Sequence, residues 1–263
     1  MEKHEIKPEE PRCLGSTEAP CYANIAMISG GKDSTAMAIK MVEEGWPVDE
    51  WVFCDTGKEF PAMYDHLDKL ENYLGITLTR LKAEQSFEYY MHDHVMTKGK
   101  RKGEKGYAWP DNGNRWCTYV LKQRVTSQYL KQFENVREYH GIALDEAHRA
   151  EKNEGKRVDY PLLLWGMTEP ECLQMCYEHG FNWDGLYEEF KRVSCYCCPL
   201  SSMAELNTLF VHYPELWQKM KEMDVGSWRT FKANYTLDRL ERRFLTQNSQ
   251  LSLFSEPAMS VQA

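Results

Sequence analysis

Near the start of the chain, a short apolar run is followed by residues that suit phosphate binding. Residues 25–35 read Ile-Ala-Met-Ile-Ser-Gly-Gly-Lys-Asp-Ser-Thr, and the pattern after them is that of an amphipathic helix. Paired glycines allow a tight turn from strand to helix and let a ligand approach the backbone. The first N–H groups of the helix, its dipole and the charge of a lysine all favour an anion. The candidate nucleotide-binding residues here are Ser29, Gly30, Gly31, Lys32, Asp33, Ser34 and Thr35.

This loop differs from the two common nucleotide-binding patterns. It lacks the four-residue spacer of the Walker A motif and the glycine spacing of the dinucleotide fingerprint. Its Ser-Gly-Gly-Lys-Asp-Ser sequence resembles the PP-loop of the adenine-nucleotide α-hydrolase superfamily. The resemblance implies that the loop binds ATP, or the equivalent phosphates of an adenylyl sulfate, with reaction at the α-phosphorus. The structural alternative is a Gly-Gly turn that binds no ligand.

Alternating strand and helix patterns predict an α/β fold, a parallel sheet with flanking helices that is Rossmann-like, with a helical C-terminal part. The strands are expected over residues 22–29, 50–54, 76–81 and 139–142, with helices over 33–44 and 61–74. We expect a loose N-terminal segment (1–20), a nucleotide-binding domain with a cysteine cluster (21–200) and a helical extension (201–263).

Asp55, Thr56 and Gly57 directly follow the second expected strand. Ligands of parallel sheets bind at the carboxyl ends of the strands, so these three residues are further candidates for nucleotide binding. The superfamily resemblance supports this prediction, since its members carry a similar Asp-Thr-Gly. An ordinary turn is the alternative.

Composition limits the classes of protein that the chain can belong to. A chain of 263 residues with 42% hydrophobic and 13% aromatic residues can form a packed core. No apolar run is long enough to span a membrane, and residues 1–12 are charged, so we expect a cytoplasmic protein without membrane partners. The net charge of −8 means that any contact with nucleic acid must be local.

One such local contact is suggested by the stretch 97–114, which has no helical or strand periodicity. Residues 97–106 contain five basic residues and one acid, with three glycines between them. The stretch is interpreted either as a solvated surface loop or as an arm that contacts nucleic acid phosphates, with Tyr107 and Trp109 available for stacking.

Two later segments narrow the resemblance to the phosphoadenosine-phosphosulfate reductase family, and especially to the ATP-pyrophosphatase members of DNA phosphorothioation systems. The first is Arg-Trp-Cys-Thr followed by Leu-Lys, over residues 115–122. The second, over residues 141–149, partly matches the substrate loop of the family, with alanines where an arginine and a serine are usual. The resemblance implies that basic side chains grip phosphates there. The candidate catalytic residues are Lys32, Asp33, Arg115, Lys122 and Arg149.

Cysteines form the second strong pattern. Residues 194–199 read Ser-Cys-Tyr-Cys-Cys-Pro, in which Cys195 and Cys198 make a Cys-x-x-Cys pair. The pair alone fits a redox disulfide, a zinc site or part of an iron–sulfur cluster. Similarity to iron–sulfur adenylyl-sulfate reductases favours a [4Fe–4S] cluster with Zn²⁺ as the alternative. The resemblance implies Cys117, Cys195 and Cys198 as metal ligands. Trp116 stands where these reductases have a further cysteine, so Cys197 is the candidate fourth ligand.

The resemblance implies an enzyme of sulfur metabolism that binds an adenine nucleotide. We expect hydrolysis of ATP with Mg²⁺ at the α–β bond, which activates a substrate for sulfur transfer and involves partner sulfur-transfer proteins. The alternative is an adenylyl-sulfate reductase that releases sulfite, with Cys197 as nucleophile, although no cysteine follows Cys198. A nucleotide-binding protein without enzymatic activity is the second alternative.

Overall fold

The computed structural model describes residues 22–151 and 157–255, so the expected N-terminal segment 1–20 lies outside the described residues. The chain separates into two compact units. The first unit contains Met1–Glu84 and Thr118–Glu188, and the second contains Gln85–Cys117 and Glu189–Ala263. Both units are therefore assembled from segments that are far apart in the sequence.

A five-stranded sheet with only parallel pairings forms the centre of the first unit, as the alternating pattern predicts. The strands lie in the order β3-β2-β1-β4-β5. Their bounds are Ala23–Ile28 (β1), Glu50–Asp55 (β2), Leu78–Lys82 (β3), Val136–His140 (β4) and Val158–Asp159 (β5). The central strand β1 is apolar and buried on both sides, which is typical of parallel sheets.

The strand order reverses at β1, because the chain continues to β2 and β3 on one side of it and returns to β4 and β5 on the other. Met27 of β1 is opposite both Val52 of β2 and His140 of β4. The carboxyl ends of β1 and β4 therefore meet at the same edge of the sheet, where ligands bind in open α/β sheets.

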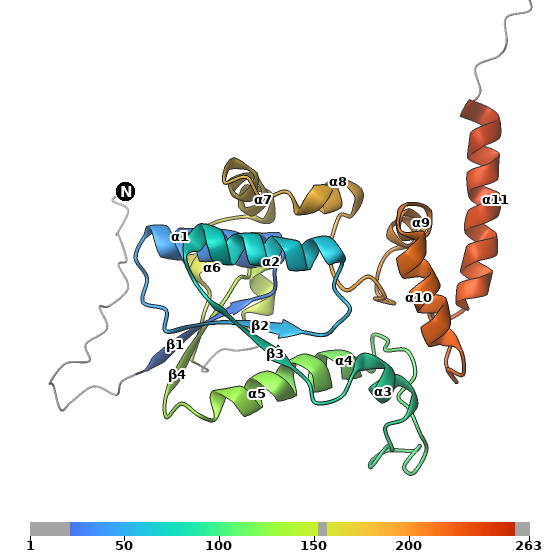
Figure 1. The fold of residues 1–263 in the computed structure, drawn as a ribbon, viewed down its shortest axis with the longest axis horizontal. Helices are drawn as coiled ribbons and strands as arrows, with labels where there is room; N and C mark the ends of the chain where they lie inside the picture. The colour runs from blue at the N-terminus through green and yellow to red at the C-terminus, as the bar shows by residue number, and fades with distance from the viewer. Residues whose placement is uncertain (1–21, 152–156, 256–263) are drawn as a thin grey trace, which may run out of the picture. The chain divides into compact units, whose positions relative to one another are not determined.

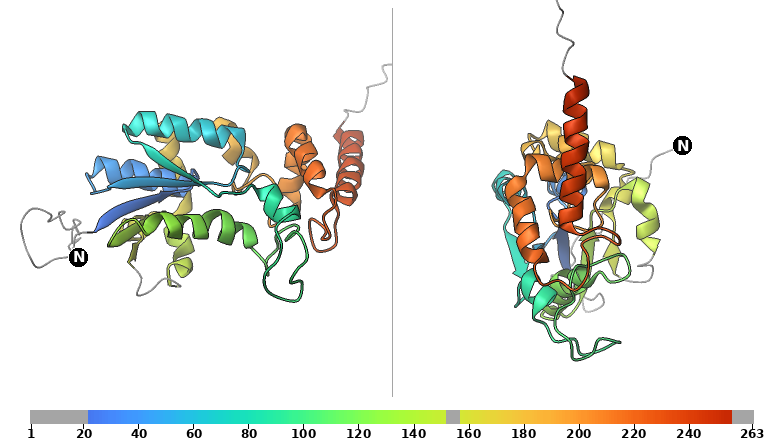
Figure 2. Two further views of the ribbon diagram at one scale, coloured as in Figure 1. Left: turned by 60° about the horizontal axis from the view of Figure 1, so that its bottom comes forward. Right: turned by 90° about the vertical axis from the view of Figure 1, so that its right-hand side faces the viewer.

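Helices cover both faces of this sheet (Figure 1). Helices α1 (Lys32–Glu43) and α2 (Pro61–Leu74) lie on one face, and α5 (Arg124–Leu130) lies on the other (Figure 2). Helix α1 is buried along most of its length, and α7 (Glu169–Glu178) packs against it. Other helices among the described residues of this unit include the 3₁₀-helices η2 (Leu144–Arg149) and η4 (Trp183–Gly185), and α6 (Pro161–Leu164).

Two elements differ from their expected form. The strand expected over 139–142 is β4, Val136–His140, because Gly141 leaves the sheet where it packs against the backbone at the start of α1. The helix after Arg115 contains a π-helical turn: α4 (Trp116–Thr118) leads into η1 (Tyr119–Gln123) and then α5. Such turns are rare and often lie at functional sites.

The second unit is mainly helical. Its described helices include α3 (Phe87–His92), α9 (Met203–His212), α10 (Pro214–Asp224) and α11 (Leu237–Ser255). Helix α8 (Leu186–Glu189) contains the point in the sequence, after Glu188, at which the chain passes from the first unit to the second. Ser202 and Glu205 form a capping box at the start of α9, a pattern that is recognisable in the sequence. Within the described part of the chain, no helix is long and apolar enough to cross a bilayer.

Trp109 belongs to the core of the second unit and is not available for base stacking. Its side chain is fully buried, its indole N–H donates to Asp224 at 2.6 Å, and its ring packs against Phe231. Tyr107 is half-buried and stacks on Trp116. The expectation of exposed stacking aromatics was therefore wrong, because these rings supply apolar area to a small core.

Candidate functional site

The loop between β1 and α1 lies at the reversal point of the sheet, and close packing requires its glycines. Gly30 has a φ of +80°, and a Cβ there would lie 2.4 Å from the Met63 sulfur. A Cβ on Gly141, after β4, would lie 2.9 Å from the backbone nitrogen of Ser34. The loop is therefore confined by neighbouring elements on both sides.

Hydrogen bonds within the loop hold it in shape. The Ser29 N–H donates to the Ser34 hydroxyl at 3.1 Å, and that hydroxyl donates to the Gly31 carbonyl at 3.0 Å. Thr35 is fully buried, and its hydroxyl pairs with His66 of α2 at 2.9 Å. Ser34 and Thr35 therefore support the loop from inside, while the backbone and Lys32 form its open side.

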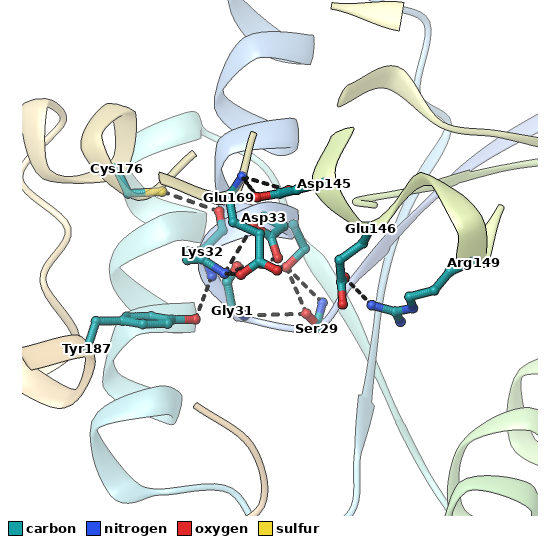
Figure 3. Close-up of polar contacts among 11 residues, drawn as sticks. Ser29, Gly31, Lys32, Asp33, Asp145, Glu146, Arg149, Glu169, Cys176 and Tyr187 are labelled. Atoms are coloured by element: carbon teal, nitrogen blue, oxygen red, sulfur yellow. Dashed lines mark hydrogen bonds and ion pairs between the residues drawn. The ribbon is translucent and has the colours of Figure 1, made fainter. Parts of the chain in front are cut away.

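Lys32 is engaged by protein acceptors in this structure. Its ammonium lies 2.5 Å from a carboxylate oxygen of Glu169 and 3.4 Å from Asp33, and its backbone N–H donates to the Tyr187 hydroxyl at 2.8 Å (Figure 3). Its side chain is only 12% exposed. Burial alone would lower the pKa of Lys32, but the Glu169 hydrogen bond and the two carboxylates raise it, so the lysine stays charged.

Asp33, in the loop, has a carboxylate oxygen that accepts no hydrogen bond from a described residue. Its Oδ1 is buried and accepts no hydrogen bond from any described residue, although the Lys32 ammonium is 3.4 Å away. Burial raises the pKa of Asp33 to about 6, against the opposing charge of Lys32. A carboxylate that is costly to ionise and has an unused oxygen is suited to receive a cation.

Asp55, in contrast, has its oxygens occupied by protein donors. Oδ1 accepts from the Gly57 N–H and the Tyr64 hydroxyl, both at 2.7 Å, and Oδ2 pairs with Lys82 at 2.9 Å. Burial alone would raise the pKa of Asp55, but these donors outweigh it and lower the pKa. Thr56 donates to Glu59 at 3.0 Å. The Asp-Thr-Gly turn is thus internally tied at the carboxyl end of β2.

The segment after β4 contributes one support and one pair of charges to this region. Asp145 accepts a hydrogen bond at 3.0 Å from the backbone of Glu169, which fixes the start of α7 and with it the carboxylate that contacts Lys32. Arg149 pairs with Glu146 and has a half-exposed side chain (Figure 3). Arg149 is the most accessible of the expected phosphate-binding cations in the first unit.

The other two expected catalytic cations, Lys122 and Arg115, come before β4 in the chain. Lys122, in the π-helical turn η1, lies 3.7 Å from the nearly buried carboxylate of Glu59. Arg115 belongs to the second unit and is exposed. The structure thus pairs Lys32 with the adjacent Asp33, and it pairs Lys122 with Glu59, which follows β2.

Several residues at the loop were missed by reasoning from the sequence. Glu169 contacts Lys32, Tyr187 accepts its N–H, and the Trp183 indole donates to the Gly30 carbonyl at 2.8 Å. Glu169 stands beside the recognisable capping box of α7, but nothing local indicates that it reaches Lys32. Tyr187 and Trp183 act across more than 150 residues of chain, so no motif could have identified them.

The cysteine motif lies in the second unit and forms the expected tight turn. The Cys198 N–H donates to the Cys195 carbonyl at 3.1 Å, and Cys197 is 2% exposed. Among the described residues, however, no group of three or more His, Cys, Asp or Glu side chains converges closely enough to hold a metal ion. The turn is present, but the set of Cys117, Cys195, Cys197 and Cys198 does not form a metal-binding arrangement in this structure.

Cys172 and Cys176 of α7 are fully buried against α1 and belong to the core of the first unit. The Cys176 thiol donates to the Lys32 carbonyl at 3.4 Å. Burial raises the pKa of Cys172 to about 12 and raises that of Cys176 as well, so both remain neutral thiols.

Comparison with known proteins identifies the family. Residues 23–201 match the sequence model of the phosphoadenosine phosphosulfate reductase domain. The chain belongs to this family. The matched range includes the glycine loop, the segment after β4 and the cysteine motif, so the resemblance that rested on these motifs is confirmed at the level of the family.

Curated relatives of this reductase-family chain include archaeal and phage proteins that carry no assigned function. Two proteins of Methanocaldococcus jannaschii are 29% and 27% identical over 75% and 74% of this chain. The matches cover 46% and 40% of those relatives, so the chain spans less than half of their length. An uncharacterised protein of Escherichia phage 186 is 25% identical over 79% of this chain and 77% of its own length.

Two solved structures share part of the backbone course. A phosphoadenylyl-sulfate reductase from Candida auris, in a phosphate complex, has a TM-score of 0.49 at 18% identity and covers 68% of this chain and 82% of its own. A U34-tRNA thiolase from Methanococcus maripaludis, with its [4Fe–4S] cluster, has a TM-score of 0.40 at 14% identity and covers 92% of this chain and 76% of its own.

Proposed function

We propose that the protein binds ATP at the loop between β1 and α1 and cleaves its α–β bond. The observation that carries the proposal is the pairing of Lys32 with Asp33, which has an unused carboxylate oxygen, at the reversal point of the sheet. An anion-binding loop beside an under-used carboxylate suits a nucleotide with Mg²⁺. Membership of a nucleotide-using family supports this proposal.

The reaction that we propose is displacement at the α-phosphorus. An oxygen nucleophile forms a bond to that phosphorus, the bond to the bridging oxygen breaks, and pyrophosphate leaves with the electron pair. Water as nucleophile gives AMP, whereas an oxygen of a second substrate becomes adenylated and can then be replaced by sulfur. Transfer of this kind depends on positioning and charge stabilisation, so it needs no covalent intermediate with the protein.

Each side chain at the loop would have a separate role. The N–H groups at the start of α1 would hold phosphate oxygens, and Lys32 would neutralise their charge. Asp33 of the loop is a better candidate Mg²⁺ ligand than Asp55 at the end of β2, because Asp55 already accepts three donors. Arg115, Lys122 and Arg149 remain proposed phosphate clamps, and Arg149 would exchange Glu146 for a phosphate.

The test is turnover of ATP with Mg²⁺ by the full chain, with separation of AMP and pyrophosphate. We expect Lys32→Ala to reduce turnover on the order of 100-fold, since it removes charge stabilisation at the phosphates. Lys69→Ala, which removes an exposed lysine of α2, is the matched control and should retain activity. Wild-type turnover that equals that of Lys32→Ala would overturn the proposal.

The family also contains reductases, and a parallel assay with an adenylyl sulfate as substrate distinguishes that activity. Sulfite release from an adenylyl sulfate in the presence of a thiol donor, without cleavage of ATP, would identify a reductase. The candidate nucleophile Cys197 is only 2% exposed, which disfavours this alternative. Nucleotide binding without turnover of either substrate would identify a binding protein.

We propose the iron–sulfur cluster separately from this reaction, and no step depends on it. Its support is the donor set, four cysteines of which two form a tight turn in the second unit. Iron and sulfide content of anaerobically purified protein tests it. We expect Cys195→Ser to lose metal and the buried Cys172→Ser to retain it; zinc in place of iron would identify the alternative metal.

Closer kinship with the phosphorothioation members, and partnership with sulfur-transfer proteins, are further proposals. They rest on the Arg-Trp-Cys-Thr segment over residues 115–118 and on the α-phosphorus chemistry proposed here.

A further inference from the structure

A two-stranded loop in the second unit, residues 94–106, forms a hairpin with a basic tip, and we call it the lysine hairpin. Backbone hydrogen bonds cross it from Met96 to Glu104 at 2.9 Å and from Gly103 to Met96 at 2.8 Å. Val95 and Lys105 pair as an antiparallel bridge. Residues 97–106, which show no helical or strand periodicity in the sequence, are therefore part of an antiparallel hairpin with a defined backbone.

Contacts at both its tip and its base fasten the lysine hairpin to the rest of the second unit. The Trp228 indole donates to the Gly106 carbonyl at 3.0 Å, and the Arg101 guanidinium lies 3.5 Å from the centre of the Trp228 ring. Gly106 has a φ of +73°, and a Cβ there would lie 2.4 Å from the Met91 carbonyl oxygen. The close approach at Gly106 shows that the hairpin is packed against α3.

The charge of the lysine hairpin is concentrated at its tip. Arg101 and Glu104 pair with each other at 2.5 Å and cancel. The remaining basic side chains are exposed, and none of them makes an ion pair with a residue that the structure describes; they are Lys98, Lys100, Lys102 and Lys105. Four uncompensated lysines on one hairpin form a strong local positive charge on a chain of net charge −8.

We propose that the lysine hairpin binds the phosphate backbone of a nucleic acid. Lysines are suited to phosphates as point charges, and a fixed hairpin holds several of them within reach of successive phosphates. The tip from Thr97 to Lys105 contains no apolar side chain, whereas a membrane-binding surface inserts apolar groups between its basic ones. The nearby Tyr107 and Trp109 belong to packed rings, so contact is made to phosphates and is independent of sequence.

This inference goes beyond the proposed nucleotide chemistry and does not depend on it. The test is binding of a labelled DNA duplex to the full chain without ATP. Fluorescence anisotropy measures the affinity at salt concentrations between about 50 and 200 mM. The test variant is K98Q/K100Q/K102Q. The matched control K131Q/K191Q/K219Q removes the same charge from three exposed lysines elsewhere in the chain.

Each phosphate-bound lysine contributes about 0.9 to the slope of log affinity against log salt. We expect the test variant to lose up to about 2.7 of this slope and to bind on the order of tenfold more weakly at low salt, for duplexes of unrelated sequence alike. The control should match the wild type. T97K adds a lysine at the exposed Thr97 and should steepen the slope, which tests the proposal even if the triple variant unfolds.

Three results would overturn the proposal. They are wild-type protein that fails to bind the duplex at low salt, equal weakening in the control and test variants, and binding to phosphatidylserine vesicles but not to the duplex.

Discussion

At the scale of single residues, the loop is occupied by the protein's own acceptors. Glu169 forms an ion pair with the Lys32 ammonium, and the Tyr187 hydroxyl accepts a hydrogen bond from the Lys32 backbone N–H. A phosphate at this loop would use these same two donors of Lys32. In the proposed complex, a nucleotide would displace Glu169 and Tyr187, so the strength of these contacts would set part of its affinity.

Replacement of Glu169 tests this competition. Glu169→Gln keeps the size of the side chain and removes its charge, so we expect nucleotide without Mg²⁺ to bind about threefold to tenfold more tightly. Isothermal titration calorimetry with a non-hydrolysable ATP analogue measures the effect. Glu178→Gln, at the other end of α7, is the control and should not differ from the wild type. Weaker binding by Glu169→Gln would show that Glu169 assists the ligand instead.

The pKa of Asp33 predicts a pH dependence of cation binding. Burial raises this pKa from 3.8 to about 6, so the folded protein loses stability as pH rises through this range and the carboxylate ionises. Mg²⁺ needs the ionised form, so its affinity should fall up to tenfold for each pH unit below about 6.

Thermal unfolding with Mg²⁺ and the ATP analogue at several pH values measures this dependence. Asp33→Asn should abolish the Mg²⁺-dependent part of the rise in unfolding temperature that the ATP analogue causes. Asp65→Asn, at an exposed residue, should preserve it. An unchanged Mg²⁺ response in Asp33→Asn would exclude Asp33 as the ligand.

At the scale of elements, the site depends on how closely β4 approaches α1. Gly141 leaves the end of β4 beside the first turn of α1, with no room for a side chain. This contact fixes the start of the helix, whose N–H groups form the proposed anion site. A residue outside the loop thereby controls the position of the loop.

Gly141→Ala should disturb both stability and binding. Its Cβ would lie 2.9 Å from backbone atoms of Ser34, so we expect a loss of about 1–3 kcal/mol in the free energy of unfolding and weaker nucleotide binding. Gly113→Ala is the control, because the nearest atom there is 3.5 Å away and belongs to a side chain. Thermal unfolding and calorimetry measure the two effects. Equal free energies of unfolding and equal nucleotide affinities in the two variants would mean that β4 and α1 can move apart without loss of stability.

At the scale of the whole molecule, stability depends on a buried histidine that joins distant elements of the first unit. His66 of α2 pairs with Thr35 of α1 and stacks on Trp183. Burial, followed by the charge of Lys69, lowers the pKa of His66 from 6.5 to about 3. The neutral imidazole therefore belongs to the folded state.

This pKa predicts the direction of acid unfolding. Above pH 6.5 the stabilisation is fully present, and it is lost as pH falls, because only the unfolded chain takes up the proton. We expect the free energy of unfolding to fall by up to about 1.4 kcal/mol per pH unit between 6.5 and 5 from this group. Denaturant unfolding of the full chain should show this slope reduced in His66→Gln and retained in His212→Gln, whose ring is half-exposed. Parallel slopes in all three proteins would contradict the assignment.

Local features of the sequence determined the type of fold, the glycine loop, the Cys195–Cys198 turn and the capping boxes at Thr168 and Ser202. Each of these follows from periodicity, or from glycine and hydrogen-bonding side chains a few residues apart, which act within one segment. The order of strands, the contacts of Lys32 with Glu169 and Tyr187, the need for Gly141 and the burial of Trp109 were decided by the tertiary structure. These depend on segments that meet only after the chain has folded, because packing and desolvation act between residues that no local pattern connects.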